Sequence, residues 1–221
     1  MSFQPLALSF QIAVIATVLA LLVGVSVAAI AALWRSRLGD LLDALITAPM
    51  VLPPTVLGYY LLVALGRQSV IGRAFESLTG SSIVFTRSGA VVAATFGALP
   101  LITKAARAAM EDVDPTLVAA ARSLGATSLR AFTSVTLPLA RGGIVAGATL
   151  GFARALGDFG VTLMLAGNIP GLTRTASLAI YDAVQANREQ EALGMVLVLS
   201  ALALATLYTV NRLQRRSYRG L

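Results

Sequence analysis

The chain has 221 residues, of which 57% are hydrophobic and 12% charged, and its mean hydropathy is +0.82. This balance is far from that of soluble domains, so lipid is the expected solvent. The net charge of +7 does not indicate a nucleic-acid partner, because the basic residues flank apolar runs instead of gathering on a soluble face. The absence of histidine and cysteine excludes disulfides, imidazole or thiolate metal sites, and Ser-His or Cys-His nucleophiles.

The N-terminal segment predicts a retained first membrane span over 10–33. It lacks the positive n-region of a signal peptide, and its apolar run is too long for an h-region. A second apolar run over 41–65 is also long enough to cross a bilayer. It contains Pro49, Pro53 and Pro54, which interrupt helix hydrogen bonds. We interpret them either as a flexible element lining a pathway or as a fixed kink accommodated by neighbouring helices.

Three further spans are expected downstream, over 88–106, 139–160 and 192–210. The middle one contains Arg154 and Asp158, so its outer end should lie against protein or water and not against lipid. These two residues are four apart, which favours an ion pair on one helix face. The expected total is five membrane spans.

Basic residues set the expected orientation in the inner membrane. With the C-terminus placed in the cytoplasm, the connection over 107–138 also falls inside, and the N-terminus falls outside. The apolar segment 175–184 is too short to cross and predicts a re-entrant or interfacial helix. No linker or clear repeat divides the chain, so 1–221 is expected to be a single domain. In the expected orientation, with the C-terminus in the cytoplasm, only a minority of the arginines lies on the outer side of the membrane: Arg67, Arg73, Arg87, Arg174 and Arg188.

The connection over 107–138, expected in the cytoplasm, contains clear signals for where helices start and end. Asp114 is a good N-cap, and Gly125 is placed to end that helix in a left-handed conformation. A second short helix is expected to begin at Thr127 or Ser128 and to end before Pro138. The pattern therefore predicts two short helices outside the membrane.

The first of these helices has one face of small and apolar residues. Leu117, Ala120, Ala121 and Leu124 recur at the spacing of a helical stripe. A face of alanines permits close approach by a partner surface, whereas a simple connection would be short and polar. Packing of the stripe on the chain's own helix ends is the alternative interpretation.

The spacing of this segment resembles the EAA loop of ABC importer permeases, whose pattern is Glu-Ala-Ala-x3-Gly-x9-Ile-x-Leu-Pro. Alanine stands at the Glu position and valine at the Ile position. The resemblance implies an all-α, type I ABC importer permease-like helical bundle, in which this loop forms coupling helices held by a cytoplasmic ATPase subunit. The matching residues are Ala119, Ala120, Ala121, Gly125, Val135, Leu137 and Pro138.

The chain itself has no phosphate-binding loop, since its one lysine, Lys104, follows Thr103 and not glycine. We therefore expect a transport subunit that is not an enzyme, binds no cofactor or metal, and depends on ATP used by a partner. The resemblance implies a homodimer of this chain, two copies of a cytoplasmic ATPase and an extracytoplasmic oxyanion-binding protein.

Two later stretches, FARALGDFG and NIPGLTRT, resemble those of molybdate permeases, with Asp158 at a position where that family has Glu. Sulfate and thiosulfate permeases share the first stretch, so these anions and tungstate remain alternatives to molybdate. A secondary transporter or channel is the alternative from another class. For Arg174, a role as an interfacial anchor or in fixing its loop is an equally open alternative to a place in the pathway. The candidate pathway residues are Arg154, Asp158, Asn168, Thr173, Arg174 and Thr175.

Overall fold

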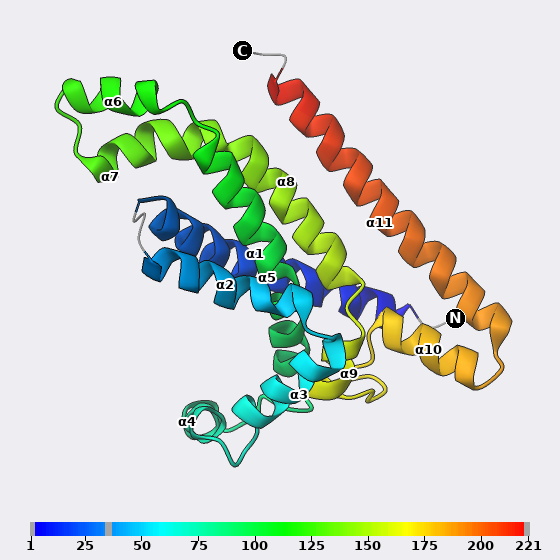
Figure 1. The fold of residues 1–221 in the computed structure, drawn as a ribbon. Coiled ribbons are helices and arrows are strands. Elements are labelled where there is room, and N and C mark those ends of the chain that lie inside the picture. Colours follow the sequence, from blue (N-terminus) through cyan, green and yellow to red (C-terminus); the bar gives the residue numbers. More distant parts are fainter. Residues whose placement is uncertain (1–2, 34–36, 219–221) are drawn as a thin grey trace.

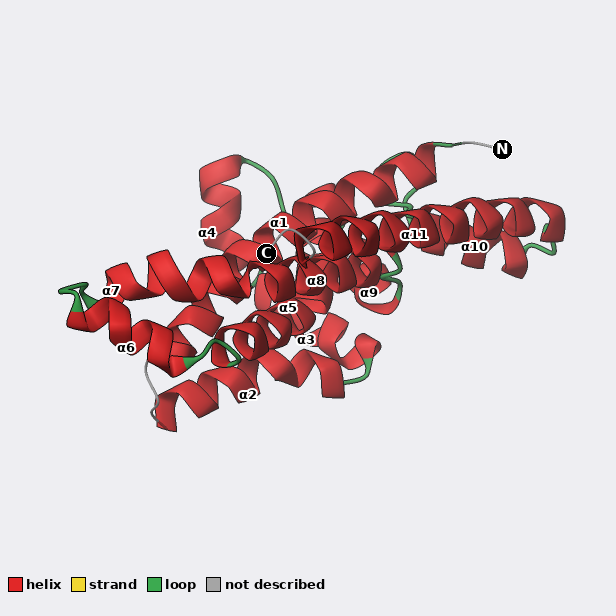
Figure 2. Ribbon diagram, turned by 90° about the horizontal axis from the view of Figure 1, so that it is seen from above, coloured by secondary structure: helices red, strands yellow, loops and turns green. Residues whose placement is uncertain are grey.

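The computed structural model describes residues 3–33 and 37–218, and that part of the chain is helical with no strand (Figures 1 and 2). The helices are α1 Gln4–Leu33, α2 Arg37–Val51, α3 Pro54–Leu65, α4 Val70–Thr79, α5 Arg87–Glu111, α6 Pro115–Ser123, α7 Ser128–Ala131, the π-helix η1 Phe132–Thr136, α8 Leu137–Leu156, α9 Gly160–Ala166, α10 Ala176–Gln185 and α11 Glu189–Tyr218.

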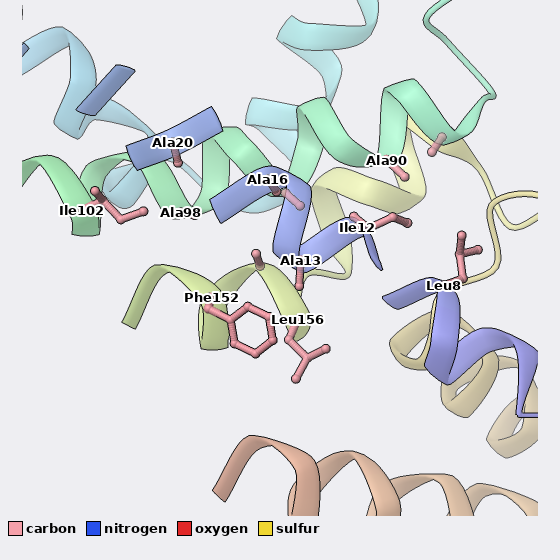
Figure 3. Packing of buried hydrophobic residues seen from close by; sticks show 13 residues of the cluster. Leu8, Ile12, Ala13, Ala16, Ala20, Ala90, Ala98, Ile102, Phe152 and Leu156 are labelled. Atoms are coloured by element: carbon pink, nitrogen blue, oxygen red, sulfur yellow. The ribbon is translucent and has the colours of Figure 1, made fainter. Parts of the chain in front are cut away.

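Small residues hold the centre of the bundle, where α1, α5 and α8 pack together (Figure 3). Helix α1 contributes Ala13, Ala16 and Ala20 to this core, and α5 contributes Ala98 and Ile102. Alanine side chains allow helix backbones to approach closely, which replaces the hydrophobic driving force that lipid does not supply. The closest-packed part of the fold is therefore this three-helix core.

Glycines on α8 form the tightest of these contacts. A Cβ atom built on Gly147 would lie 2.6 Å from the Cβ of Ala105, and one built on Gly151 would lie 2.6 Å from Ile102 Cδ1. The G-x-x-x-G spacing of these two glycines, which also suits a contact between protomers, thus serves the packing of α8 on α5 within one chain.

Four of the described helices are long and apolar enough to cross a membrane: Gln4–Ala32 of α1, α5, the continuous helix Ser128–Leu156, and Glu189–Thr209 of α11. The predicted second span over 41–65 differs, because it forms two helices. Helix α2 runs through Pro49 and ends at Val51, and α3 begins at Pro54. Pro54 forces the preceding residue, Pro53, into an extended conformation with ψ 137°. Two adjacent prolines therefore end one helix and start another.

A second break lies in the segment 139–160, which was predicted as one helix. Helix α8 ends at Leu156, and α9 starts at Gly160. The second coupling helix is also different from its prediction. It does not end before Pro138, because α7 continues through η1 directly into α8, and Pro138 lies in the first turn of α8, directly after the π-helix.

The bundle has two distinct ends (Figure 1). The α6–α7 hairpin and the C-terminal end of α11 lie at one end, while α4, α10 and the start of α1 lie toward the other. The predicted short helix over 175–184 is present as α10. The two ends are thus built from different kinds of element.

Candidate functional site

The two helix breaks lie against each other. A Cβ atom on Gly160, the first residue of α9, would lie 2.8 Å from the Cβ of Pro54, the first residue of α3. A Cβ on Gly58 would lie 2.6 Å from Met164 Cβ one turn further along the two helices. Helices α3 and α9 therefore pack side by side with their N-terminal ends together (Figure 1). Interrupted helices of this kind occur in membranes where backbone is buried in protein or lines a cavity.

A buried ion pair occupies the α8–α9 break. Arg154 NH1 donates to Asp158 Oδ1 at 2.9 Å, and the Asp158 side chain is only 2% exposed. The predicted pair is therefore present, although Asp158 lies beyond the end of α8 and not on its face. A buried carboxylate needs such a partner, because an unpaired charge in this environment is very costly.

Thr162 of α9 completes the coordination of this carboxylate. Its backbone N–H donates to Asp158 Oδ2 at 3.0 Å, and its hydroxyl donates to the same oxygen at 2.6 Å. Each carboxylate oxygen thus has its own partner, one from α8 and one from α9. Asp158 links the two helices across the break.

Gly97 of α5 leaves room beside the ion pair. A Cβ atom at this position would lie 3.6 Å from both Arg154 NH2 and Asp158 Oδ1. The Arg154 side chain is 36% exposed, in contrast to the buried carboxylate that it contacts. The arginine side chain is therefore only partly covered by the protein.

The loop that follows α9 uses most of its predicted donors internally. Thr173 is fully buried, accepts a hydrogen bond from Ile169 N and donates one to Gly167 O. Thr175 caps α10 by accepting from Leu178 N. Both hydroxyls shape the loop in this structure.

Arg174 and Asn168 belong to a polar network on the outer side of this loop. Arg174 Nε donates to Asn168 Oδ1 at 2.9 Å, and its NH1 lies 3.2 Å from Asp182 Oδ2 of α10. Asp182 also pairs with Arg188, which pairs with Glu191 of α11. Arg174 thus joins the loop to two helices, which agrees with its interpretation as a loop-fixing residue.

The loop over 107–138 has the predicted caps. Asp114 Oδ1 accepts from Thr116 N at 2.8 Å, and Gly125 has a φ of +88°. The hydrogen bonds from Thr116 lower the pKa of Asp114 below its ordinary value of 3.8. The side chain of Asp114 is therefore an ionised cap at neutral pH.

The apolar stripe of the loop is not covered by the chain itself. Helix α6 has no buried residue, and Leu117 and Leu124 are 48% and 89% exposed. The alternative in which this stripe packs on the chain's own helix ends is therefore wrong. Of the motif residues, Ala119, Ala120, Gly125 and Pro138 are exposed, and Ala121, Val135 and Leu137 are half-buried.

The base of the same loop is anchored in the bundle. Phe132 and Leu137 pack against a cluster that includes Met110 of α5 and Ala140 of α8. The π-helix between them makes α7 continuous with α8. A force on the exposed hairpin is thus applied directly to a helix that ends at the Arg154–Asp158 pair.

Sequence reasoning did not identify Thr162 and Gly97 as site residues. Threonine and glycine are common in apolar helices, and only the folded chain brings these two to Asp158. One signal was available, because Gly157 and Gly160 flank Asp158 and Phe159 in an otherwise helical run.

Comparison with known proteins places the chain among membrane transport subunits. The family described as "Binding-protein-dependent transport system inner membrane component" matches residues 20–221. The molybdenum transport system permease protein ModB of Azotobacter vinelandii is 40% identical over 208 residues, which cover 93% of this chain and 92% of that protein. The ModB protein of Escherichia coli K12 is 43% identical over 178 residues, which cover 80% and 78%.

Solved structures share the fold at low sequence identity. A membrane chain of the MetNI methionine ABC transporter, in an inward-facing conformation, has a TM-score of 0.78 at 17% identity and covers 98% of this chain and 99% of its own. A bacterial ABC transporter that imports alginate has a TM-score of 0.72 at 17% identity, covering 98% and 80%. The expected type I importer permease fold is confirmed. The match over residues 20–221 establishes that the chain belongs to the binding-protein-dependent transport system inner membrane component family.

Proposed function

We propose that this chain is the permease subunit of an ATP-driven importer and forms the translocation pathway for an oxyanion, molybdate. The observation that carries the proposal is the uncovered α6 helix, whose alanine face and exposed leucines lie at one end of the bundle. An apolar surface of this kind favours a protein partner. The identity of the cargo is supported by relatives that are named as molybdenum transport permeases.

The working importer contains other subunits. Two copies of this chain form a homodimer with the pathway at their interface, since one short bundle encloses a poor route alone. Two cytoplasmic ATPase subunits bind the α6–α7 hairpins and use the ATP, so this chain needs no cofactor of its own. An extracytoplasmic binding protein delivers the oxyanion. Binding of the ATPase or of the binding protein shifts the permease between conformations only if that partner binds one conformation more tightly than the other.

The chain lies in the inner membrane with its N-terminus outside and its C-terminus in the cytoplasm. The excess of basic residues near the coupling loop and the tail supports this orientation. The position of the C-terminal end of α11 and the α6–α7 hairpin at the same end of the bundle is consistent with it.

Arg154 is the pathway residue with the best geometry for an anion. Its side chain is partly exposed, and its guanidinium lies at a helix break and is partly neutralised by Asp158. A transport site must bind its ion weakly enough to release it, and an arginine that already has a counter-ion meets this requirement. Asn168 and Arg174 supply donors nearer the end that contains α10, and Thr173 and Thr175 hold the loop that presents them.

Reconstitution tests the proposal. Liposomes that contain the permease, its ATPase and the binding protein should accumulate molybdate only when ATP is supplied. Permease alone should transport nothing. Uptake without nucleotide would indicate a secondary transporter or channel. Competition by tungstate, sulfate or thiosulfate ranks the alternative cargoes, and preferential uptake of one of these anions would replace molybdate as the assignment.

A further inference from the structure

We propose that Thr162 is a positioning residue for oxyanion transport, which acts through Asp158 on Arg154. The inference rests on the proposed function and deepens it, because it concerns how the pathway arginine is kept available to an anion. Thr162 is 1% exposed, so it does not itself present a donor to a passing ion. Its effect must pass through the carboxylate that it binds.

The geometry divides the carboxylate between two partners. Both donors of Thr162 converge on Asp158 Oδ2, at 3.0 Å and 2.6 Å, and Arg154 NH1 contacts Oδ1 at 2.9 Å. A free carboxylate and a guanidinium prefer a bidentate pair with two parallel hydrogen bonds. Thr162 prevents this arrangement because it occupies the second oxygen.

The single contact leaves donors available on the arginine. A guanidinium carries five N–H donors, and the hydrogen bond from Arg154 to Asp158 uses NH1. Gly97 of α5 lies beside NH2 and has no side chain that would cover it, whereas a Cβ atom there would already be in van der Waals contact with NH2, at 3.6 Å. The partly exposed Arg154 can therefore bind an oxyanion through NH2 while it keeps its counter-ion through NH1.

An arginine that keeps its counter-ion suits transport of an anion better than an unpaired arginine does. Asp158 keeps its partners on both carboxylate oxygens, so the buried carboxylate is not left without a partner when the anion binds. The oxyanion meets an arginine of reduced net charge and is released easily. Without the hydroxyl of Thr162, the backbone N–H of Thr162 alone holds Oδ2, and Asp158 can turn more easily toward Arg154 and engage NH2 as well.

Two substitutions at one position test the proposal. Thr162→Val keeps the shape and the backbone N–H but removes the hydroxyl, and Thr162→Ser keeps the hydroxyl. ATP-dependent molybdate uptake is measured in proteoliposomes with saturating loaded binding protein. We expect Thr162→Val to lower the maximal rate about tenfold and Thr162→Ser to stay within about twofold of wild type, since one charge-assisted hydrogen bond is worth about that factor or more.

A second measurement separates positioning from packing. In an Asp158→Ala background, which itself transports slowly, Thr162→Val should change the rate by less than about twofold, because the residue through which Thr162 acts is gone. A further tenfold loss there, equal rates for the Val and Ser variants, or failure of Thr162→Val to assemble with the ATPase would overturn the proposal. Absence of uptake by the wild-type importer would instead contradict the proposed function.

Discussion

Gly147 lies so close to α5 that a single methyl group cannot be added without movement. Its added Cβ would be 2.6 Å from the Cβ of Ala105 and 3.5 Å from the Cα of Ile102, which is backbone. We expect Gly147→Ala to destabilise the bundle by about 1–3 kcal/mol, the usual cost of overpacking. Loss of the folded protein on heating in detergent, followed by size-exclusion chromatography, measures the change.

A compensating substitution provides the control. Ala105→Gly removes the methyl group that Gly147→Ala would strike, so the double variant should recover part of the lost thermal stability. Recovery is incomplete because glycine within a helix costs up to about 1 kcal/mol relative to alanine. Additive losses in the double variant would contradict the contact between these two residues.

Of the residues around Asp158, some could be identified from the sequence and others could not. Arg154 and Asp158 stood out because charges inside an apolar run are rare, and their pairing could be predicted from their separation. Thr162 is four residues beyond Asp158, a spacing that is equally common for unrelated residues in a helix. Only the break between α8 and α9 turns that spacing into a double hydrogen bond.

The coupling helix α6 depends on its N-terminal cap. Asp114 accepts from Thr116 N, and the helix has no buried residue to stabilise it from within the chain. Asp114→Ala should therefore fray α6 and weaken binding of the ATPase several-fold, measured by co-purification or titration in detergent. Asp114→Asn retains the accepting oxygen and should bind nearly as wild type. Equal weakening by both variants would indicate a role for the charge and not for the cap.

The pH dependence of this cap follows from its hydrogen bonds. They lower the pKa of Asp114 below its unfolded value of 3.8, so its stabilising contribution is fully present above that pH and is lost as the pH falls through the folded pKa. Docking should therefore not vary between pH 6 and 8 on account of Asp114, and the test above is valid at any pH in that range.

Elements with strong local signals could be predicted, and those set by tertiary contacts could not. The caps at Asp114 and Gly125 follow from residue type alone, and both are present. The adjacent Pro53 and Pro54 indicated an interruption where α2 and α3 separate, but the hydropathy of 41–65 suggested one span. The continuity of α7 with α8 has no sequence signal, because a π-helix satisfies its backbone without special residues.

At the scale of the whole molecule, hydropathy predicted the long helices and gave no information about how they cross. The described part of the chain has four helices of spanning length, and the remaining predicted span, over 41–65, is divided into α2 and α3. Helices α2 and α3 follow each other in series, and the Pro54–Gly160 contact packs the start of α3 on the start of α9. Helices α3 and α9 lie far apart in the sequence. Their packing could not be predicted, because the periodicity of a single sequence does not report contacts between distant segments.

The topology itself can be tested directly because the natural chain has no cysteine. Ser123 of α6 and Ser77 of α4 are both exposed and lie toward opposite ends of the bundle. In cells without the ATPase subunit, Ser77→Cys should react with a membrane-impermeant maleimide added outside, and Ser123→Cys should react only in inverted vesicles. The wild-type chain is the blank. If Ser123→Cys were labelled from outside, the α6 surface would be separated from any cytoplasmic ATPase, and the coupling of ATP use to the Arg154 pathway would have no structural basis.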